Sequence, residues 1–459
     1  MAQTKTETLM QTIRDRIARR TLAPGDRMPS VRRFADQMKV SPSTVVDAYD
    51  RLAAEGLIHA KRGSGFFVSP QILPPMALAD TGTVQTRSVD PFWVSRQSLD
   101  PSPGALQPGC GWLPEDWMPQ DALRRALRAL ARSDDTATLT NYGPARGSLP
   151  LRRLLLARFA DENLRLDADQ LMLTGSASQA MDLICRLLLR PGDTVLVDDP
   201  GYFNFRALLR AHQVKVVGVP YTPQGPDLAA FEAALRDAPR LYITNSALHN
   251  PTGATMTPQI AHRLLALATA HDLTVVEDDT FADLEPDPSP RLAVLDGLNS
   301  VLKIGGFSKT LSASVRCGFV AGRADWIEAL VDLQVATSFG GPSPIATEML
   351  THVLAGGGYR KHLAEVHRRL ATARKRVETR LSPLGITPWI TPRGGFYLWG
   401  RLPTGIDAAT VAQRAMTENV ILAPGNVFSP AQNAPHFMRF NVTQMDDPRV
   451  YDVLERAMA

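Results

Sequence analysis

Short apolar runs alternate with longer amphipathic stretches over the second half of the chain. The runs are rich in aliphatic and β-branched residues and cover 171–173, 194–197, 215–219, 241–244, 274–276, 301–304 and 317–321. Stretches with helical spacing of apolar residues lie between several of them, at 179–189, 228–237 and 258–271. This alternation predicts an α/β sheet with crossover helices. Because ligands bind at the carboxyl ends of the strands in such sheets, the residues directly after each run are candidates for a site.

The first seventy residues show a different pattern. Ile13 and Ile17 fall on one face of an amphipathic helix. Ser30 is a good N-cap for a second helix, and Ser41, followed by Pro42, is a good N-cap for a third. Residues 57–60 and 65–68 flank a basic tip and read as a small hairpin. Helix, helix, short turn, helix and basic wing form an architecture that places one helix in a DNA major groove.

Periodicity disappears between these two regions. Residues 70–103 are rich in proline and in small polar residues, and we expect them to be a linker between residues 1–69 and residues 104–459. Within the linker, residues 91–94 (PFWV) are the apolar part that would dock on a neighbouring surface. From about residue 355 to 459, a helical stretch at 359–381 and short strands near 395–399 and 437–442 predict a smaller α/β domain that closes over a substrate.

The composition narrows the class of protein. A hydrophobic content of 44% with 21% charged residues over 459 residues is typical of a globular protein with two or three domains. Three widely spaced cysteines give neither a disulfide framework nor a zinc pattern, and a reducing cytosol is the natural compartment. The polar first twelve residues contain no signal-peptide core, and no apolar run reaches the length of a membrane span. We therefore expect a cytoplasmic protein without a membrane segment.

The basic excess of the chain lies in the N-terminal region. Residues 1–70 hold 12 Lys and Arg against 7 Asp and Glu, whereas the rest of the chain is close to neutral. A local positive field on a small domain favours a polyanionic partner, although many small domains are basic for solubility alone.

One loop carries most of the candidate chemistry. It is residues 305–320 (GGFSKTLSASVRCGFV), which join two apolar runs. Lys309, held in such a loop, can form a Schiff base with an aldehyde and be displaced by an incoming amine. The neighbouring serines and Arg316 are the donors that a phosphate would need. Taken alone, the loop favours a solvated lysine in a Gly/Ser loop over this chemistry.

Other candidates follow earlier runs. Residues 174–180 (TGSASQA) open a helix, where backbone N–H groups and the Ser178 hydroxyl form a phosphate seat. Tyr202 offers a flat ring for stacking, or is a core tyrosine. Asn250, in an Asn-Pro-Thr-Gly turn, places an amide at the sheet edge. Asp278 ends its run as a carboxylate that stays ionised there only beside a cation such as a protonated ring nitrogen, or else serves as an N-cap.

The N-terminal region resembles the winged helix-turn-helix of GntR-type transcriptional regulators. The resemblance rests on residues 24–33 (PGDRMPSVRR), 40–49 (VSPSTVVDAY) and 63–68 (GSGFFV). It implies a double-stranded DNA operator as partner, and the alternative is a three-helix interaction module. The residues implied to meet DNA are Arg32, Arg33, Ser43, Thr44, Arg62 and Gly65.

The ordered set of strand-end residues resembles fold-type I aminotransferases, which use pyridoxal 5'-phosphate. By that resemblance Lys309 forms the internal aldimine and serves as the catalytic base, Asp278 pairs with the pyridine nitrogen, and Arg439 binds the substrate carboxylate. The other implied contacts to the cofactor are Asn250 at the ring hydroxyl, Tyr202 stacked on the ring, Ala177, Ser178, Ser308 and Arg316 at the phosphate, and Tyr142, which reaches the phosphate of the adjacent subunit.

Two positions depart from the aminotransferase pattern. Phe281 stands where many relatives have a tyrosine that touches the ring hydroxyl and the lysine, and Gly306 stands where many have a serine or threonine. Both departures favour cofactor binding with slow or partial transamination.

A GntR-type DNA reader fused to an aminotransferase-like domain resembles the MocR subfamily of regulators. The resemblance implies a head-to-tail homodimer that senses an amino acid, an amine or pyridoxal phosphate through Lys309. The alternative is an active aminotransferase that moves an amino group between an amino acid and a 2-oxo acid. The effector, the operator and the sign of regulation are not determined by the sequence.

Overall fold

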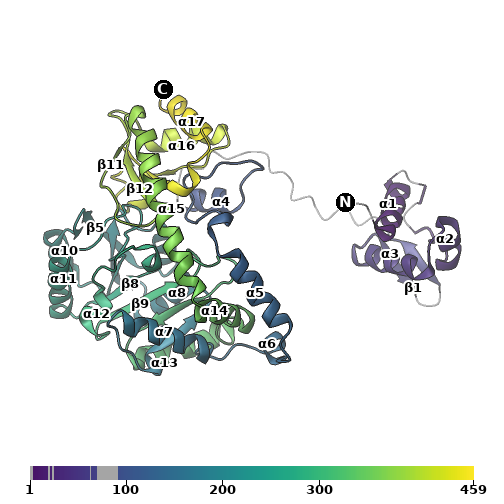
Figure 1. Cartoon of the computed structure of the whole chain (residues 1–459), viewed down its shortest axis with the longest axis horizontal. Coiled ribbons are helices and arrows are strands. Elements are labelled where there is room, and N and C mark those ends of the chain that lie inside the picture. Colours follow the sequence, from purple (N-terminus) through teal and green to yellow (C-terminus); the bar gives the residue numbers. More distant parts are fainter. Residues whose placement is uncertain (1–3, 19–20, 23–24, 62–63, 70–90) are drawn as a thin grey trace. The chain divides into compact units, whose positions relative to one another are not determined.

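The computed structural model describes residues 4–18, 21–22, 25–61, 64–69 and 91–459. They belong to two compact units, Met1–Thr86 and Arg87–Ala459, whose elements are labelled in Figure 1. Residues 70–90 of the expected linker lie outside the described residues. No helix in the described ranges combines the length and the apolar character that crossing a membrane requires.

The N-terminal unit has the predicted winged helix-turn-helix architecture. Ser30 and Ser41 cap their helices by accepting from the N–H groups of Arg33 and Thr44, which satisfies donors that the first turn leaves free. The fully buried Tyr49 donates its hydroxyl to Pro29 O at 2.9 Å. The elements are α1 (Lys5–Ala18), α2 (Val31–Met38), α3 (Pro42–Ala54), β1 (Ile58–Lys61) and β2 (Gly65–Val68).

The wing of this unit is tied to the segment before α2. Strands β1 and β2 pair antiparallel, and the Met28 N–H donates to Phe66 O at 2.8 Å. The Val68 N–H donates to Asp26 O at 2.8 Å on the same side. The wing and the turn before α2 therefore form one hydrogen-bonded piece.

The larger unit is built on an eight-stranded sheet in the order β3-β10-β9-β8-β7-β4-β5-β6. Strands β4, β5, β7, β8 and β9 pair in parallel. Strand β10 is antiparallel to both β3 and β9, so β3 runs in the same direction as β9. The carboxyl ends of β3, β4, β7, β8 and β9 consequently lie at one edge. The strands are β3 (Leu171–Thr174), β4 (Thr194–Asp199), β5 (Lys215–Thr222), β6 (Gly225–Pro226), β7 (Leu241–Thr244), β8 (Thr274–Asp278), β9 (Val301–Gly306) and β10 (Gly318–Ala321).

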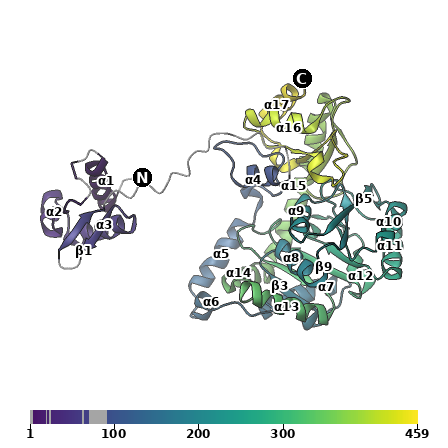
Figure 2. The same cartoon turned by 180° about the vertical axis from the view of Figure 1, so that it is seen from behind.

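Helices cover both faces of the sheet, as Figures 1 and 2 show. Alternate strand residues point to opposite faces: Leu173 packs in one apolar cluster and Met172 in another. A strand buried on both faces reads as a continuous apolar run, which is why the runs in the sequence predicted these strands. The helices are α5 (Gln120–Ala131), α6 (Ala137–Thr140), α7 (Leu149–Asp161), α8 (Ala177–Leu188), α9 (Phe203–Ala211), α10 (Leu228–Ala234), α11 (Pro258–Ala270), α12 (Leu292–Asp296), α13 (Ala324–Ser338) and α14 (Pro344–Ala355).

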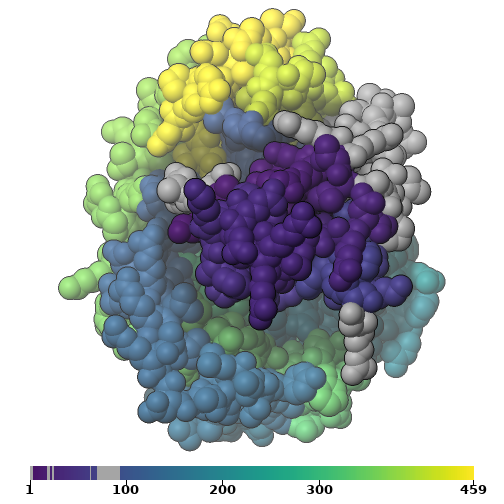
Figure 3. Space-filling view, turned by 90° about the vertical axis from the view of Figure 1, so that its right-hand side faces the viewer, coloured from purple at the N-terminus to yellow at the C-terminus, as the bar shows by residue number. Residues whose placement is uncertain are grey.

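A smaller α/β subdomain completes the unit, joined by the long helix α15 (Gly358–Leu381) that runs from the larger sheet toward it in Figure 1. Its antiparallel sheet has the order β11-β12-β14-β13. Figure 3 shows the C-terminal residues in yellow at one end of the unit and much of the blue segment after residue 100 at the other. The remaining elements are β11 (Thr387–Pro388), β12 (Tyr397–Arg401), α16 (Ala408–Thr417), β13 (Ala423–Pro424), β14 (Phe437–Asn441) and α17 (Arg449–Met458).

The segment before α5 belongs to the smaller subdomain. Leu106 forms a parallel bridge with Val420, and the Gly109 N–H donates to Ile421 O at 2.9 Å. The Asn441 N–H donates to Pro108 O at 2.6 Å. Residues 106–109 therefore pair with backbone groups that lie more than three hundred residues later in the sequence.

The described end of the expected linker differs from the expectation. Residues Pro91–Leu99 form helix α4, and its Val94 is buried among residues of the larger unit. The proline at the first helical position is compatible with a helix start. The buried side chain of Val94, rather than the polar composition of the linker as a whole, accounts for the helix here.

Candidate functional site

Two of the candidate DNA-binding residues, Arg32 and Arg33, lie on α2 of the N-terminal unit. Arg32 and Arg33 both have exposed side chains, and neither forms an ion pair within the described part of the unit. Unpaired guanidinium groups next to a helix start suit phosphate oxygens. The positive charges of Arg32 and Arg33 are therefore not neutralised by carboxylates in the described part of the unit.

Hydroxyl groups gather at the first turn of α3. Ser41 Oγ lies 2.8 Å from Ser43 Oγ and 2.7 Å from Thr44 Oγ1. Ser43 is exposed and Thr44 is half-buried. Gly65, at the start of β2, is exposed and has a φ of +96°, a conformation that glycine adopts without strain. Arg62, the other wing residue predicted to meet DNA, lies outside the described residues.

Lys309 follows β9 at the carboxyl edge of the large sheet. Its amine donates to the Gly111 backbone oxygen at 2.6 Å and lies 5.8 Å from the centroid of the Phe281 ring. Burial lowers the pKa of Lys309 to about 8, and the neighbouring charge of Arg439 acts in the same direction. With this pKa about a tenth of the amine is neutral at pH 7, far more than for an ordinary lysine, and the neutral amine can attack a carbonyl.

Asp278 is the last residue of β8 and is 6% exposed. The Thr280 N–H donates to its Oδ1 at 3.1 Å, and the Asn245 amide donates to its backbone oxygen at 2.7 Å. Burial raises the pKa of the Asp278 carboxyl. Among the described residues no cation pairs with this carboxylate, so a protonated ring nitrogen is the kind of partner it lacks.

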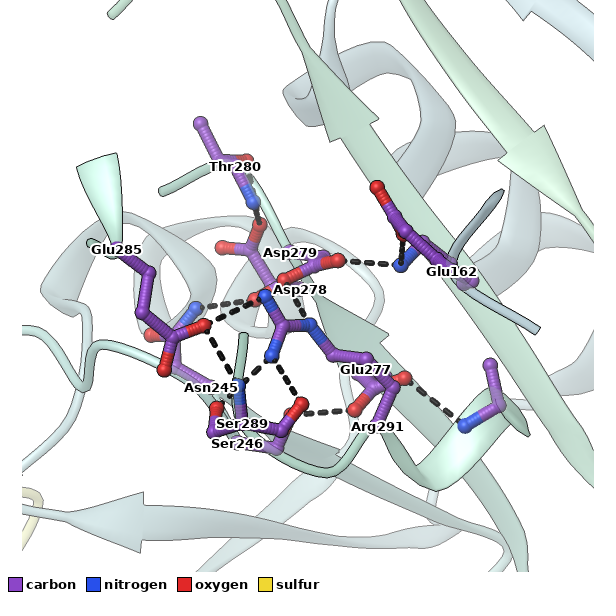
Figure 4. Close-up of polar contacts among 12 residues, drawn as sticks. Glu162, Asn245, Ser246, Glu277, Asp278, Asp279, Thr280, Glu285, Ser289 and Arg291 are labelled. Carbon is purple, nitrogen blue, oxygen red and sulfur yellow. Dashed lines mark hydrogen bonds and ion pairs between the residues drawn. The ribbon is translucent and has the colours of Figure 1, made fainter. Parts of the chain in front are cut away.

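The adjacent carboxylate, Asp279, lies in a different environment, shown in Figure 4. Arg291 Nε donates to Asp279 Oδ1 at 2.9 Å, and the Lys303 amine donates to its other oxygen. A second nitrogen of Arg291 donates to Glu285 Oε2 at 2.9 Å. Burial alone would raise the pKa of Asp279, but Lys303 and Arg291 hold it below the usual range. Two cations thus neutralise Asp279, whereas no residue in the described part of the chain neutralises its neighbour Asp278.

Arg439 reaches the same site from strand β14 of the smaller subdomain. It is 2% exposed and donates to Asn250 Oδ1 at 2.9 Å and to Gly109 O at 2.7 Å. Its guanidinium lies 4.3 Å from the Tyr397 ring centroid and 4.8 Å from that of Phe428. Its Nε has no partner among the described residues. A buried guanidinium without a carboxylate partner is suited to bind an anion.

The start of α8 lies against strands β9 and β10. Ala177 and Ser178 are the first two residues of the helix, so their N–H groups have no acceptor inside it. A Cβ on Gly318 would lie 2.7 Å from the Ala177 nitrogen, and one on Gly306 would lie 3.1 Å from Cys317 O. The glycine that departs from the family pattern at 306 therefore sits where little room remains for a side chain.

Two further phosphate candidates belong to the loop around Lys309. Ser308 is half-buried, whereas Arg316 is exposed with a φ of +48°. Arg316 forms no ion pair with another described residue, and its charge contributes to the low pKa of Lys309. A left-handed conformation costs a residue with a side chain about 1–2 kcal/mol and is found at functional sites. The loop therefore presents a free cation near Lys309.

The two candidate tyrosines differ in burial. Burial raises the pKa of the Tyr202 phenol, and the charges of Arg439 and Asp278 both act on it, so its ring belongs to the site. Tyr142 is 75% exposed and packs edge-on against Phe339 at 5.0 Å between ring centroids. The structure therefore gathers the predicted cofactor residues except Tyr142, which faces outward.

Several site residues were missed by sequence reasoning. The Gly109 and Gly111 backbone oxygens accept from Arg439 and Lys309, respectively. A Cβ on Gly111 would lie 3.2 Å from the Tyr397 hydroxyl and 3.9 Å from Lys309 Nζ. Tyr397 thus brings a hydroxyl toward the lysine, in a site where Phe281 has none. The two glycines of the Gly-Cys-Gly motif were the only clue in the sequence. Every residue has a backbone oxygen, so residue type does not reveal which oxygens act as acceptors.

Two protein-family models match the chain. The model described as aminotransferase class I and II covers residues 113–456. The model described as bacterial regulatory proteins, gntR family, covers residues 5–68.

Individual relatives divide between regulators and enzymes. The chain is 30% identical over 457 residues to the HTH-type transcriptional regulator YdcR of Escherichia coli K12, covering 95% of this chain and 94% of that protein. It is 29% identical over 353 residues to a 2-aminoadipate transaminase of Thermus thermophilus, covering 75% of this chain and 86% of that enzyme. The crystal structure of LysN, an α-aminoadipate aminotransferase of Thermus thermophilus complexed with N-(5'-phosphopyridoxyl)-L-leucine, superposes with a TM-score of 0.72 at 26% identity, covering 80% of this chain and 94% of that one.

Proposed function

Since the chain belongs to the class I and II aminotransferase family and carries a gntR-family DNA-binding domain, we propose that it senses an amino compound, or its own cofactor, at Lys309. This domain pairing is that of the MocR subfamily of transcriptional regulators. Pyridoxal 5'-phosphate is the cofactor. The observation that supports the proposal is that most of the predicted cofactor-binding groups, including a buried lysine with a lowered pKa, lie together in the same chain as a DNA-binding domain.

The residues of the site fit this cofactor. Asp278 is a buried carboxylate without a cation, which suits a protonated pyridine nitrogen. The free N–H groups of Ala177 and Ser178, with Ser308 and Arg316 beside the lysine, suit a phosphate. Tyr202 supplies a ring to stack, and Asn250 supplies an amide for the ring hydroxyl. When bound, the cofactor supplies an aldehyde that condenses with primary amines and a ring that withdraws electrons.

The roles of the protein groups then follow from their surroundings. Lys309 would hold the cofactor through its amine, and as a free amine with a pKa of about 8 it would serve as a base that accepts a proton. Arg439 binds a carboxylate of the effector. Its Nε has no partner among the described residues, and its two terminal nitrogens, which donate to Asn250 and Gly109, would donate to the carboxylate instead. An effector with an amine next to a carboxylate, hence an amino acid, satisfies both residues.

We propose that the regulator acts as a head-to-tail homodimer. Tyr142 and Phe339 are exposed aromatic residues in contact with each other, and further exposed apolar side chains flank them in the sequence. Burial of such a surface by a second copy would stabilise a dimer. In that dimer Tyr142 would reach the phosphate seat of the partner. These flanking residues are Leu139, Leu149, Val335 and Ile345.

The decisive experiment joins a spectrum to DNA binding. We expect the full-length protein with added pyridoxal phosphate to show a visible absorption band that Lys309→Ala abolishes. The affinity for a duplex selected by the chain from a random-sequence pool should change when the cofactor or one amino acid of a panel is added. A protein without the band would overturn the cofactor role, and a DNA affinity indifferent to cofactor and amino acids would overturn the sensing role.

A working aminotransferase is the second candidate. It is favoured by the low pKa of Lys309 and by the unpartnered nitrogen of Arg439, and the ring of Phe281, which lacks a hydroxyl, opposes it. Steady-state formation of a 2-oxo acid from an amino acid donor would support this candidate. A single stoichiometric half-reaction, or none, would leave sensing as the function.

A further inference from the structure

Helix α4, which follows the segment joining the two units, lies on residues that form the candidate site. Its Val94 is 1% exposed and packs in an apolar cluster with Phe203, Trp399 and Phe428. Phe203 follows Tyr202 directly in the sequence, and Phe428 stacks beneath the guanidinium of Arg439. The helix is therefore in contact with the supports of two site residues that belong to different subdomains.

A chain of hydrogen bonds runs from α4 to the candidate stacking ring. Ser95 Oγ donates to Asn204 Oδ1 at 3.1 Å. Asn204 Nδ2 donates to the Tyr202 hydroxyl at 2.8 Å. The Asn204 amide thus uses its acceptor toward the helix and its donor toward the tyrosine. Such a chain orients each member, and its bonds strengthen one another where water is scarce.

The loop that carries Tyr202 is held on its other side by the smaller subdomain. The Gly201 N–H donates to Phe428 O at 2.8 Å, and Arg206 donates to Ser429 O at 2.6 Å. The rings of Phe203 and Phe428 meet edge-on, 5.1 Å apart. The position of the Tyr202 ring along this loop is therefore set by contacts to the small subdomain, and the orientation of its hydroxyl by α4.

We propose that Ser95 and Asn204 are positioning residues for the Tyr202 ring, and that through them α4 links occupancy of the cofactor site to the segment leading to the DNA reader. This inference rests on the proposed function, since it needs a cofactor against Tyr202 and a response on DNA. A ligand that moves the Tyr202 ring changes the hydrogen bond between Tyr202 and Asn204. It thereby also changes the hydrogen bond between Asn204 and Ser95 on α4. Coupling requires that the ligand bind with different affinity when the Ser95–Asn204 hydrogen bond is formed and when it is broken.

The test uses two hydroxyl deletions on the same helix. Ser95→Ala removes the first link of the chain, whereas Ser98→Ala removes a buried hydroxyl that has no hydrogen-bond partner among the described residues. Loss of one net hydrogen bond corresponds to about a two- to tenfold change in affinity. We expect Ser95→Ala to weaken pyridoxal phosphate binding by about this factor and to shift its absorption band, with Ser98→Ala matching the wild type.

The second measurement is the response on DNA. In full-length protein, Ser95→Ala should reduce the ratio of DNA affinities with and without pyridoxal phosphate, while the affinity without the cofactor stays that of the wild type. Ser95→Thr, which retains a hydroxyl, should restore both readouts. Asn204→Ala, which cuts both bonds, should be at least as impaired as Ser95→Ala, with unchanged thermal unfolding of the N-terminal unit.

The outcomes separate this inference from the proposed function. If the wild type binds the cofactor and responds on DNA, but Ser95→Ala and Asn204→Ala behave like Ser98→Ala, the positioning role is wrong and the sensing function stands. If the wild type itself neither takes up pyridoxal phosphate nor responds on DNA, both are overturned.

Discussion

Arg439 donates to Asn250 Oδ1 at 2.9 Å, across 189 positions of sequence and from one subdomain to the other. Arg439 forms no ion pair with another described residue, so this hydrogen bond joins a buried cation to a neutral acceptor. A carboxylate that enters would replace a weaker acceptor with a charged one.

Replacing Arg439 should therefore separate effector binding from cofactor binding. We expect Arg439→Lys to keep the cofactor band but to weaken the amino-acid-induced shift of the band by about ten- to hundredfold in concentration, because lysine lacks the planar fork. Arg401→Lys is the matched control, since Arg401 is exposed on the adjacent strand and lies over the Phe437 ring. An unchanged amino-acid response in Arg439→Lys would refute the assigned role.

The rate of cofactor uptake should follow the ionisation of Lys309. With its pKa lowered to about 8, the neutral fraction of the amine rises about tenfold between about pH 7 and about pH 9 and levels off above that. Stopped-flow absorbance after mixing with pyridoxal phosphate measures this rate. A lysine with an ordinary pKa would instead give a rate that still climbs steeply at about pH 9. Lys309→Ala should show no covalent phase at any pH.

The exposed arginines of α2 should carry a salt-dependent part of DNA binding. For Arg32→Ala with Arg33→Ala we expect weaker binding to any duplex and a slope of log affinity against log salt reduced by about two, one for each lost phosphate contact. Arg51→Ala is the control, because Arg51 is paired with Asp47 at 3.0 Å within the same unit. Equal slopes for the double variant and the control would contradict the assignment.

Two lysines of the large sheet provide a test of the buried ion cluster. Lys303 is 1% exposed and pairs with Asp279, whereas Lys215 lies at the surface and pairs with Asp237 at 2.8 Å. Removing one partner of a buried pair costs about 3–5 kcal/mol, and removing one of an exposed pair about 0–1 kcal/mol. Lys303→Met should thus lower the free energy of unfolding by several kcal/mol more than Lys215→Met.

The measurement for this pair is urea unfolding followed by tryptophan fluorescence. All six tryptophans lie in the larger unit, so the signal reports that unit alone. A difference between the two variants below about 1 kcal/mol would mean that Asp279 does not depend on Lys303. The tryptophans are Trp93, Trp112, Trp117, Trp326, Trp389 and Trp399.

The parts of this fold that could be predicted from sequence are those with a local cause. Strands buried on both faces produce continuous apolar runs, and caps such as Ser30 and Ser41 act within a few residues. The strand-end positions of Lys309 and Asp278 followed from the rule for parallel sheets. The helical state of residues 91–99 was missed, because Val94 is stabilised by tertiary contacts and the surrounding composition favours a linker.

The chemistry of the site was less predictable where it depends on backbone or on distant pairs. Gly109 and Gly111 act through carbonyl oxygens, which every residue has. The distinction between Asp278 and Asp279 depends on Arg291 and Lys303, two cations brought in from other elements. The Tyr397 hydroxyl near Lys309 arises from the packing of one subdomain on another, which no spacing in the sequence encodes.

The position of α4 bears on where this protein can be cut. The aminotransferase match begins at residue 113. Val94, Gly109 and Gly111 precede it, yet all three contact residues that lie within the match. A fragment that starts at the match boundary would expose Phe203 and Phe428 to water and leave Arg439 and Lys309 without their carbonyl acceptors. An excised aminotransferase-like fragment that keeps these contacts therefore has to start no later than Pro91.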